Sequence, residues 1–408
     1  MSIKANFTVS REIIDDATRS LQQLIRIPTL AGEGREIDAA NLLFDKARKI
    51  GLNCRVEQPK KGLGSFIAKI AGECDENLLL LSHLDVAPVR SPQTWRYPPF
   101  RGEVAENTIW GRGAIDCKGL VVAWLMVLQL LHHLAIPLRR GVVMVAAADE
   151  ESGGKWGTQW LLENAPDVQT CQWALNEGGG YPLQFGKRRF LTCQTGEKGY
   201  AYLRWKSPHQ RIRSQRFTLK ASPTASHQRL ATTLLPEALG RFPRLASPLI
   251  RHLQRNAPYR LNSDELWHDT VEIRSTQTGV ELHLRGMPGV EIRQVIREVT
   301  DRLKLLEDAA VDFSAFSGTE SPLDTDLYCT IEQVFERFQP GVKLIPHITP
   351  GYSDSRFLRQ HGIPVYGFFP LPFPTPITSQ HGPNECLELT GLRRAIEILF
   401  SVVYQFCT

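Results

Sequence analysis

The chain has 408 residues, of which 42% are hydrophobic and 22% charged, and these values exclude a wholly disordered, collagenous or fibrous protein. The formal net charge of +5 is too weak a surplus to indicate a nucleic-acid partner. No apolar run approaches the roughly 20 residues that cross a bilayer, and the first residues lack the apolar core of a signal peptide. We therefore expect a cytoplasmic protein of two or three domains that binds neither nucleic acid nor membrane.

The first 197 residues alternate between helical and strand patterns. Residues 11–50 carry apolar side chains at helical spacing and predict one or two amphipathic helices. Four short apolar runs then predict buried strands: SFIAKIAG, NLLLLSHLD, GVVMVAAADE and ALNEGGG. A buried helix, GLVVAWLMVLQLLHHL, lies between the second and the third run. Strands that alternate with helices favour an α/β fold, with a mostly parallel sheet and helices on both of its faces.

The pattern changes after residue 197. Residues 198–312 read as strand, helix, two hairpin-like strands, amphipathic helix and strand, and this βαββαβ order predicts a small sheet with two helices on one face. Residues 313–408 return to the buried α/β pattern and should rejoin the first sheet. We therefore predict one main domain, built from residues 1–197 and 313–408, and a second domain inserted at residues 198–312.

Polar side chains follow the predicted strand NLLLLSH. His83 and Asp85 are two residues apart, so their side chains point to one face. Imidazole is a good zinc ligand, and a carboxylate two residues on can hold its free N–H and fix its tautomer. Further along the chain, Asp116 follows a glycine-rich turn and precedes the buried helix. A carboxylate at that place suits either a helix N-cap or a bridge between two cations.

Two further strands end in acidic residues. GVVMVAAADEESGG ends in Asp149, Glu150 and Glu151, and the turn residues after them hold these acids near the sheet edge. Clustered carboxylates repel one another, and a bound cation relieves that repulsion. ALNEGGG repeats the arrangement with Glu177 and three glycines, which allow a close backbone approach. His381, far downstream in TSQHGPNE, would taken alone be an ordinary surface histidine.

These residues are more informative as a set. The carboxyl ends of parallel strands meet at one edge of a sheet, where open α/β sheets bind their ligands. Two histidines and several carboxylates without cysteine are typical of a catalytic zinc pair.

In motif order and spacing, nearly the whole chain resembles the dizinc hydrolases that include aminoacylase, acetylornithine deacetylase, succinyl-diaminopimelate desuccinylase and the glutamate and Gly-X carboxypeptidases. The resemblance implies two Zn²⁺ ions, with cobalt or manganese as substitutes. It implies the metal ligands His83 and Glu177 for one ion, Glu151 and His381 for the other, and Asp116 as the bridge. It also implies that Asp85 orients His83, that Glu150 is the general base on the attacking water, and that the Asp116–Cys117 peptide bond is cis.

The resemblance extends to the substrate side of the site. PGYSDSRFLRQHGIPVYGF is similar to the family's Gly-Thr-x-Asp-x-Arg stretch, which implies that Arg356 holds a substrate carboxylate and that Gly351 and Tyr352 line the site. Arg285 in HLRGMPG matches an arginine of the family's inserted lid domain. The family's lid histidine reaches across a dimer to polarise the scissile carbonyl. Here His209 and His227 are the candidates, and the third alternative is that neither acts. We expect a homodimer formed through this lid.

The resemblance predicts zinc-dependent hydrolysis of an amide bond in a small peptide or N-acyl amino acid with a free carboxylate, of the carboxypeptidase or aminoacylase type. A deacylase of the acetylornithine or succinyl-diaminopimelate type is the alternative within enzymes. A non-catalytic binding protein on the same fold is the alternative from another class. Such a descendant should have lost ligands or the base, whereas this sequence carries all of them.

Overall fold

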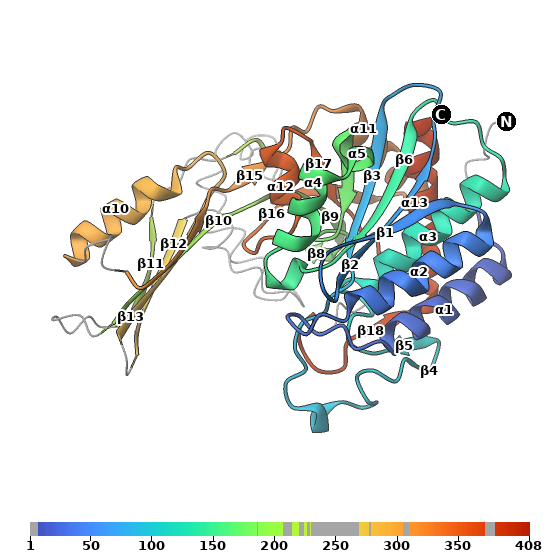
Figure 1. The fold of residues 1–408 in the computed structure, drawn as a ribbon. Helices are drawn as coiled ribbons and strands as arrows, with labels where there is room; N and C mark the ends of the chain where they lie inside the picture. Colours follow the sequence, from blue (N-terminus) through green and yellow to red (C-terminus); the bar gives the residue numbers. More distant parts are fainter. Residues whose placement is uncertain are drawn as a thin grey trace.

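The computed structural model describes residues 7–185, 187–206, 214–219, 224–226, 229, 269–276, 279–304, 310–371 and 380–408. These residues form one sheet of ten strands, a second of five and a third of three. Figure 1 shows the ten-stranded sheet among helices on one side of the molecule, and the five-stranded sheet with α10 (Ile292–Leu303) on the other.

The ten-stranded sheet takes its strands from both ends of the sequence. They are β1 (Asn53–Lys60), β2 (Leu63–Ile70), β3 (Asn77–His83), β6 (Gly141–Ala147), β7 (Cys171–Asn176), β8 (Pro182–Phe185), β9 (Arg188–Glu197), β15 (Thr319–Glu320), β16 (Val342–Thr349) and β17 (Val365–Gly367). The helices around it are α1 (Arg11–Ile25), α2 (Glu36–Ile50), α3 (Lys118–His133), α4 (Trp160–Asn164), α5 (Pro166–Gln169), α11 (Asp326–Phe338), α12 (Ser355–Gln360) and α13 (Leu389–Cys407). The four apolar runs that predicted buried strands are therefore β2, β3, β6 and β7.

The centre of this sheet is parallel. β6, β3, β7 and β17 are neighbours in that order, and each pairs with the next in the parallel sense. The pairing of β3 with β6 runs as far as His83 beside Ala147. Side chains along β3 alternate between the two faces, with Leu78 and Leu80 in one apolar cluster and Leu79 and Leu81 in the other. A strand buried on both faces is continuously apolar, as the sequence of β3 is.

Helices cover both faces of the sheet. The larger apolar cluster joins one face to α1, α2, α3, α11 and α13, and the smaller one joins the other face to α4, α5 and α12 (Figure 1). α3 is fixed on β3 by the indole N–H of Trp124, which donates to the carbonyl oxygen of Leu81 at 3.0 Å. The predicted α/β class, with a largely parallel central sheet and helices on both faces, is confirmed.

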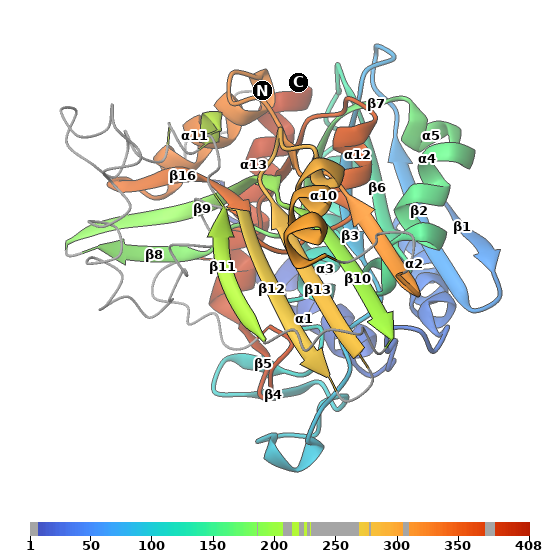
Figure 2. The same ribbon diagram turned by 90° about the vertical axis from the view of Figure 1, so that its left-hand side faces the viewer.

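The five-stranded sheet is antiparallel. In spatial order its strands are β11 (Gln215–Leu219), β12 (Asp269–Thr276), β13 (Gly279–Gly286), β10 (Gly199–Lys206) and β14 (Asp312–Phe316), and Figure 2 shows several of them side by side. Apolar residues of α10 pack against one face of this sheet. β11 is an additional strand that the predicted βαββαβ order did not contain. Its segment, QRFTL, is short and lacks the apolar alternation that would predict a strand. The helix predicted from HQRLATTLLPEAL, residues 227–239, lies outside the described residues except for position 229.

The chain crosses between the two larger sheets twice. Only Lys198 separates β9 from β10, and only residues 317–318 separate β14 from β15. The two crossings lie against each other, since a Cβ on Gly199 would be 2.5 Å from the backbone nitrogen of Gly318. The division into domains at residues 197/198 and 312/313 stays a prediction. Within the described residues, no helix combines the length and apolarity that a membrane span requires.

Candidate metal centre

Three neighbouring parallel strands deliver polar side chains to one edge of the ten-stranded sheet. His83 is the last residue of β3, and Glu177 follows the last residue of β7. Glu150 and Glu151 begin a short turn, η2 (Glu150–Ser152), three residues after β6 ends. Because these strands run parallel and adjoin in the order β6, β3, β7, their carboxyl ends lie at the same edge.

The remaining two predicted ligands reach this edge on loops. Asp116 precedes α3, and His381 precedes β18 (Cys386–Glu388). β18 pairs with β5 (Thr108–Trp110), which also pairs with β4 (Glu103–Ala105). The loop that carries Asp116 follows β5 and the loop that carries His381 leads into β18, so the two loops adjoin paired strands. The Asp116–Cys117 peptide bond is cis, as expected.

Asp116 lies between the two histidines. Its Oδ1 is 3.0 Å from Nε2 of His83, and its Oδ2 is 3.1 Å from Nε2 of His381. The same His381 nitrogen is 3.1 Å from Oε1 of Glu151. One ligand atom each from Asp116, Glu151 and His381 therefore lies within 4.8 Å of the others. A carboxylate with one oxygen toward each histidine has the arrangement that a bridging ligand needs.

The charges at this edge depend on one another. Burial, followed by the negative charge of Asp116, raises the pKa of Glu177 to about 8. Hydrogen bonds to Asp116 and Glu151 raise the pKa of His381 to about 10. Burial raises the pKa of Asp116 as well, but hydrogen bonds from His381 and His83 outweigh it and hold this pKa below its ordinary range. Imidazole nitrogens and carboxylate oxygens are donors that bind zinc, so these residues fit a cation site.

Glu150 lies beside the ligands and is held by Asp85. It is 9% exposed, and burial raises its pKa well above the ordinary value. The backbone N–H groups of Glu150 and Glu151 donate to the two carboxylate oxygens of Asp85 at 3.1 and 2.8 Å. Nδ1 of His83 is 2.9 Å from the backbone carbonyl oxygen of Asp85 but 3.5 Å from its carboxylate. The Asp85 carboxylate thus binds mainly the turn of the two glutamates, and its backbone carbonyl lies nearest the His83 ring.

Asp354 is a buried acid in this region that sequence reasoning missed. Its Oδ2 accepts a hydrogen bond from the Thr158 hydroxyl at 2.6 Å, and burial raises its pKa to about 6. Gly154 packs directly on it, since a Cβ there would lie 2.1 Å from Oδ1 of Asp354, and Gly154 also has a φ of +71°. Only glycine suits that position. The available signal was the place of Asp354, two residues before Arg356 in the segment PGYSDSR.

Arg356, Tyr352 and Gly351 lie between the two larger sheets. The Arg356 guanidinium donates to the carbonyl oxygens of Ser353 at 2.9 Å and Gly153 at 2.6 Å. It also stacks 4.9 Å from the ring of Tyr352. Arg356 is 5% exposed, whereas Tyr352 is 41% exposed, and Gly351 precedes Tyr352 in the loop between β16 and α12. Arg356, which lies in the first turn of α12, therefore contacts Gly153, the residue directly after the turn that carries Glu150 and Glu151.

The five-stranded sheet reaches the same loop through Arg285. Its guanidinium donates to the backbone carbonyl of Pro350 and lies 5.7 Å from the ring of Tyr200. Both candidate lid histidines, His209 and His227, lie outside the described residues. His283 is a further histidine of this sheet, with Nδ1 at 3.2 Å from the Tyr200 hydroxyl. In the sequence, His283 could have been noticed because it is two residues before Arg285, a spacing that puts both side chains on one face of β13.

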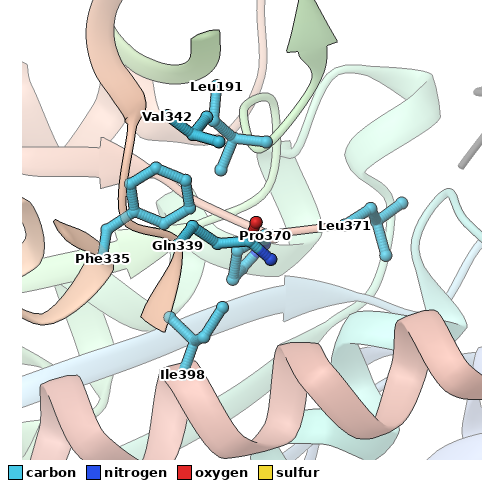
Figure 3. Close-up of a pocket in the computed structure, with 7 residues that line it drawn as sticks. All are labelled: Leu191, Phe335, Gln339, Val342, Pro370, Leu371 and Ile398. Atoms are coloured by element: carbon cyan, nitrogen blue, oxygen red, sulfur yellow. The ribbon is translucent and has the colours of Figure 1, made fainter. Parts of the chain in front are cut away.

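A small apolar pocket lies elsewhere in the same half of the molecule. Figure 3 shows the side chains that line it: Leu191, Phe335, Gln339, Val342, Pro370, Leu371 and Ile398. They come from β9, α11, β16, α13 and the segment after β17. Six of the seven side chains are apolar and none titrates, so this pocket belongs to the packing between α11, α13 and the sheet.

Comparisons with known proteins assign the chain to a protein family. The sequence model described as Peptidase family M20/M25/M40 matches residues 79–405. Aminoacylase-1A of Rattus norvegicus is 25% identical over 392 residues, which are 94% of this chain and 93% of that protein. Succinyl-diaminopimelate desuccinylase of Paracoccus denitrificans is 32% identical over 194 residues, 46% of this chain and 50% of that protein. Among solved structures, the M20 family metallo-carboxypeptidase Sso-CP2 from Sulfolobus solfataricus has a TM-score of 0.71 at 16% identity, covering 96% of this chain and 99% of that one.

Proposed function

Because the chain belongs to Peptidase family M20/M25/M40, we propose that it is a dizinc hydrolase that cleaves an amide bond in a small peptide or N-acyl amino acid with a free carboxylate. Metal-dependent amide hydrolysis is the activity of the aminoacylases and carboxypeptidases that it resembles. The observation that carries the proposal is Asp116, whose two carboxylate oxygens lie 3.0 and 3.1 Å from His83 and His381.

Five residues would hold the two ions. In the proposal, His83 and Glu177 bind one, Glu151 and His381 bind the other, and Asp116 bridges them. Bound zinc ions polarise a carbonyl oxygen and lower the pKa of water, so that hydrolysis proceeds near neutral pH. Cobalt or manganese is expected to substitute, since the donor set of imidazole and carboxylate is shared by these ions.

Glu150 is the general base in this proposal. It takes a proton from the attacking water as the carbon–oxygen bond forms, and it gives a proton to the amine nitrogen as the carbon–nitrogen bond breaks. Burial raises its pKa well above the ordinary value, and a carboxylate with a raised pKa is a stronger base. Asp85 fixes the backbone of Glu150 and Glu151 through two hydrogen bonds, and so keeps base and ligand side by side.

Arg356 and Arg285 are the proposed contacts for the substrate carboxylate, with Gly351 and Tyr352 beside them. A guanidinium has five N–H donors, and the two backbone carbonyls that Arg356 binds leave donors for a substrate. The Arg356 guanidinium contacts Gly153, and Gly153 is two residues after the proposed ligand Glu151 in the sequence. A substrate whose amide lies at the metal centre would therefore bring a nearby carboxylate within reach.

This assignment predicts a loss of discrimination in an arginine variant. The wild-type enzyme should prefer an N-acyl amino acid over its C-terminal amide by about 10- to 150-fold in kcat/KM, since a hydrogen bond to a charged group contributes about 1.5–3 kcal/mol. Arg356→Lys should narrow that ratio, because lysine lacks the planar fork that binds a carboxylate. Steady-state kinetics on both substrates measure it. The exposed Arg297→Lys serves as the control. An unchanged ratio in Arg356→Lys and in Arg285→Lys would exclude both arginines from carboxylate binding.

A deacylase of the succinyl-diaminopimelate type is a second candidate. The observation that favours it is the 32% identity to the Paracoccus denitrificans enzyme, although that match spans only 46% of this chain. One panel separates the candidates: dipeptides, N-acyl amino acids, N-acetylornithine and N-succinyl-diaminopimelate, each with zinc or cobalt added. Preferred hydrolysis of either of the last two supports the deacylase. A complete lack of amide hydrolysis supports the non-catalytic binding protein instead.

The proposal includes a homodimer through the five-stranded sheet and a cytoplasmic location. An uncovered strand edge can pair with a second copy of the chain. β14 is an edge strand of this sheet, and two apolar side chains are exposed there: Phe313 within β14 and Val311 just before it. Light scattering after size exclusion tests the dimer, which would have twice the chain mass of 46.0 kDa.

A further inference from the structure

Glu385 is a buried carboxylate behind the metal centre, and nothing above gives it a role. It is fully buried, and its two oxygens accept four hydrogen bonds. Three come from backbone N–H groups of the loop before α3: Gly113 at 3.0 Å, Ile115 at 2.9 Å and Asp116 at 3.0 Å. A carboxylate has about four acceptor sites, so these bonds and one from an arginine saturate it. The backbone of Asp116 is thus fixed from behind while its side chain faces the two histidines.

Arg112 supplies the fourth hydrogen bond and connects the second loop. Its Nη1 donates to Glu385 at 2.6 Å, and its Nη2 donates to the carbonyl oxygen of Gly382 at 3.2 Å. Arg112 is 1% exposed and lies 5.3 Å from the ring of Trp95. Gly382 is the residue after His381, so the same ion pair holds the loops of both Asp116 and His381.

His381 depends on contacts that hold its loop in place more than His83 does. Its side chain is 57% exposed and its φ is +60°, in the left-handed region that non-glycine residues rarely adopt. His83, in contrast, ends a central strand and is 2% exposed. The ion pair thus joins the two loops that carry Asp116 and His381, in addition to the pairing of β5 with β18.

We propose that the buried Arg112–Glu385 pair is a positioning element that sets the distance between Asp116 and His381, and so determines the affinity of the metal ion that Asp116, Glu151 and His381 would share. This inference rests on the proposed metal centre and concerns only its second ion. Residues that support metal ligands from behind typically change metal affinity by about 10- to 100-fold when they are replaced. The pair touches neither substrate nor metal.

The test is a metal titration of the full-length apoprotein, with no substrate present. Zn²⁺ affinity is measured by competition with a chromogenic chelator, and Co²⁺ binding by its visible spectrum. Glu385→Gln removes one acceptor oxygen and puts an NH₂ group among N–H donors. The binding step of the site that contains His381 should lose about 10- to 100-fold in affinity, and the other step should lose less. His381→Ala identifies which of the two steps belongs to that site, because it removes a ligand of that site alone.

Glu397→Gln is the matched control. Glu397 is also a buried carboxylate, 4% exposed, and binds Val9, Arg393 and Arg394 away from the proposed ligands. It should lower thermal stability without changing either metal affinity. An unchanged affinity at the His381 site in Glu385→Gln, or an equal loss at both steps, overturns the inference. If Glu385→Gln does not fold, Arg112→Lys is measured against the same two outcomes. A wild-type protein that binds no metal contradicts the proposed function itself, which keeps the two failures distinct.

Discussion

Replacing Glu150 with alanine should lower kcat by about 10²- to 10⁴-fold while both metal ions stay bound, since this is the usual contribution of a general base. The expectation follows from its place in the turn: Glu150 is buried beside the ligands, but the contact with His381 is made by Glu151, at 3.1 Å. Single-turnover kinetics, together with the metal content of the same sample, measure both parts of the prediction.

Glu151→Ala is the comparison variant for Glu150→Ala, because the two residues are neighbours with opposite expected roles. Asp85 binds the backbone N–H of each, so both variants keep the hydrogen bonds that shape the turn. Glu151→Ala should lose metal, and its activity should recover in part at high zinc concentration. If Glu150→Ala loses the metal and Glu151→Ala keeps it, the two assignments are inverted.

Asp116→Ala should abolish hydrolysis and reduce the content of both ions. Asp116 is the only described side chain that approaches both histidines, at 3.0 and 3.1 Å, so its loss affects each site and leaves the two imidazoles without their shared partner. Elemental analysis after gel filtration measures the ions, and the hydrolysis of an N-acyl amino acid measures the activity.

Asp149→Ala is the control for Asp116→Ala. Asp149 belongs to the acidic cluster that also supplies Glu151, but its Oδ2 accepts the backbone N–H of Trp156 at 3.0 Å and contacts no proposed ligand in the described residues. It should retain both ions. Two tightly bound ions in Asp116→Ala would exclude a bridging role, and loss of metal in Asp149→Ala would show that the acidic cluster had been divided wrongly.

The parts of the fold that sequence predicts well are those with a strong local pattern. β3 and β6 are continuous apolar runs bounded by turns, so both their type and their buried place in a parallel sheet can be read directly. β11 was missed because the residues QRFTL have no such pattern, and a strand of this kind is specified by its pairing with β12.

The candidate site divides in the same way. His83, Glu151 and Glu177 could be proposed because each follows an apolar strand, and the topology then brings them together. For Asp354 the sequence offered only its place before Arg356, and for Glu385 it offered no signal, because their partners are distant in sequence: Thr158 is 196 residues from Asp354, and Gly113 is 272 residues from Glu385. A carboxylate that binds backbone N–H groups has no sequence signature, since every residue type except proline can donate them.

The central claim is metal-dependent amide hydrolysis, and the most direct measurement is restoration of activity to the apoprotein. The purified chain is stripped with a chelator, zinc is added back in steps, and cleavage of an N-acetyl amino acid is followed by release of the free amine. The account predicts no activity without metal, a rise on addition, and a plateau at two zinc ions per chain. Full activity in the stripped protein, or no cleavage of any N-acyl amino acid or dipeptide at two bound ions, would contradict it.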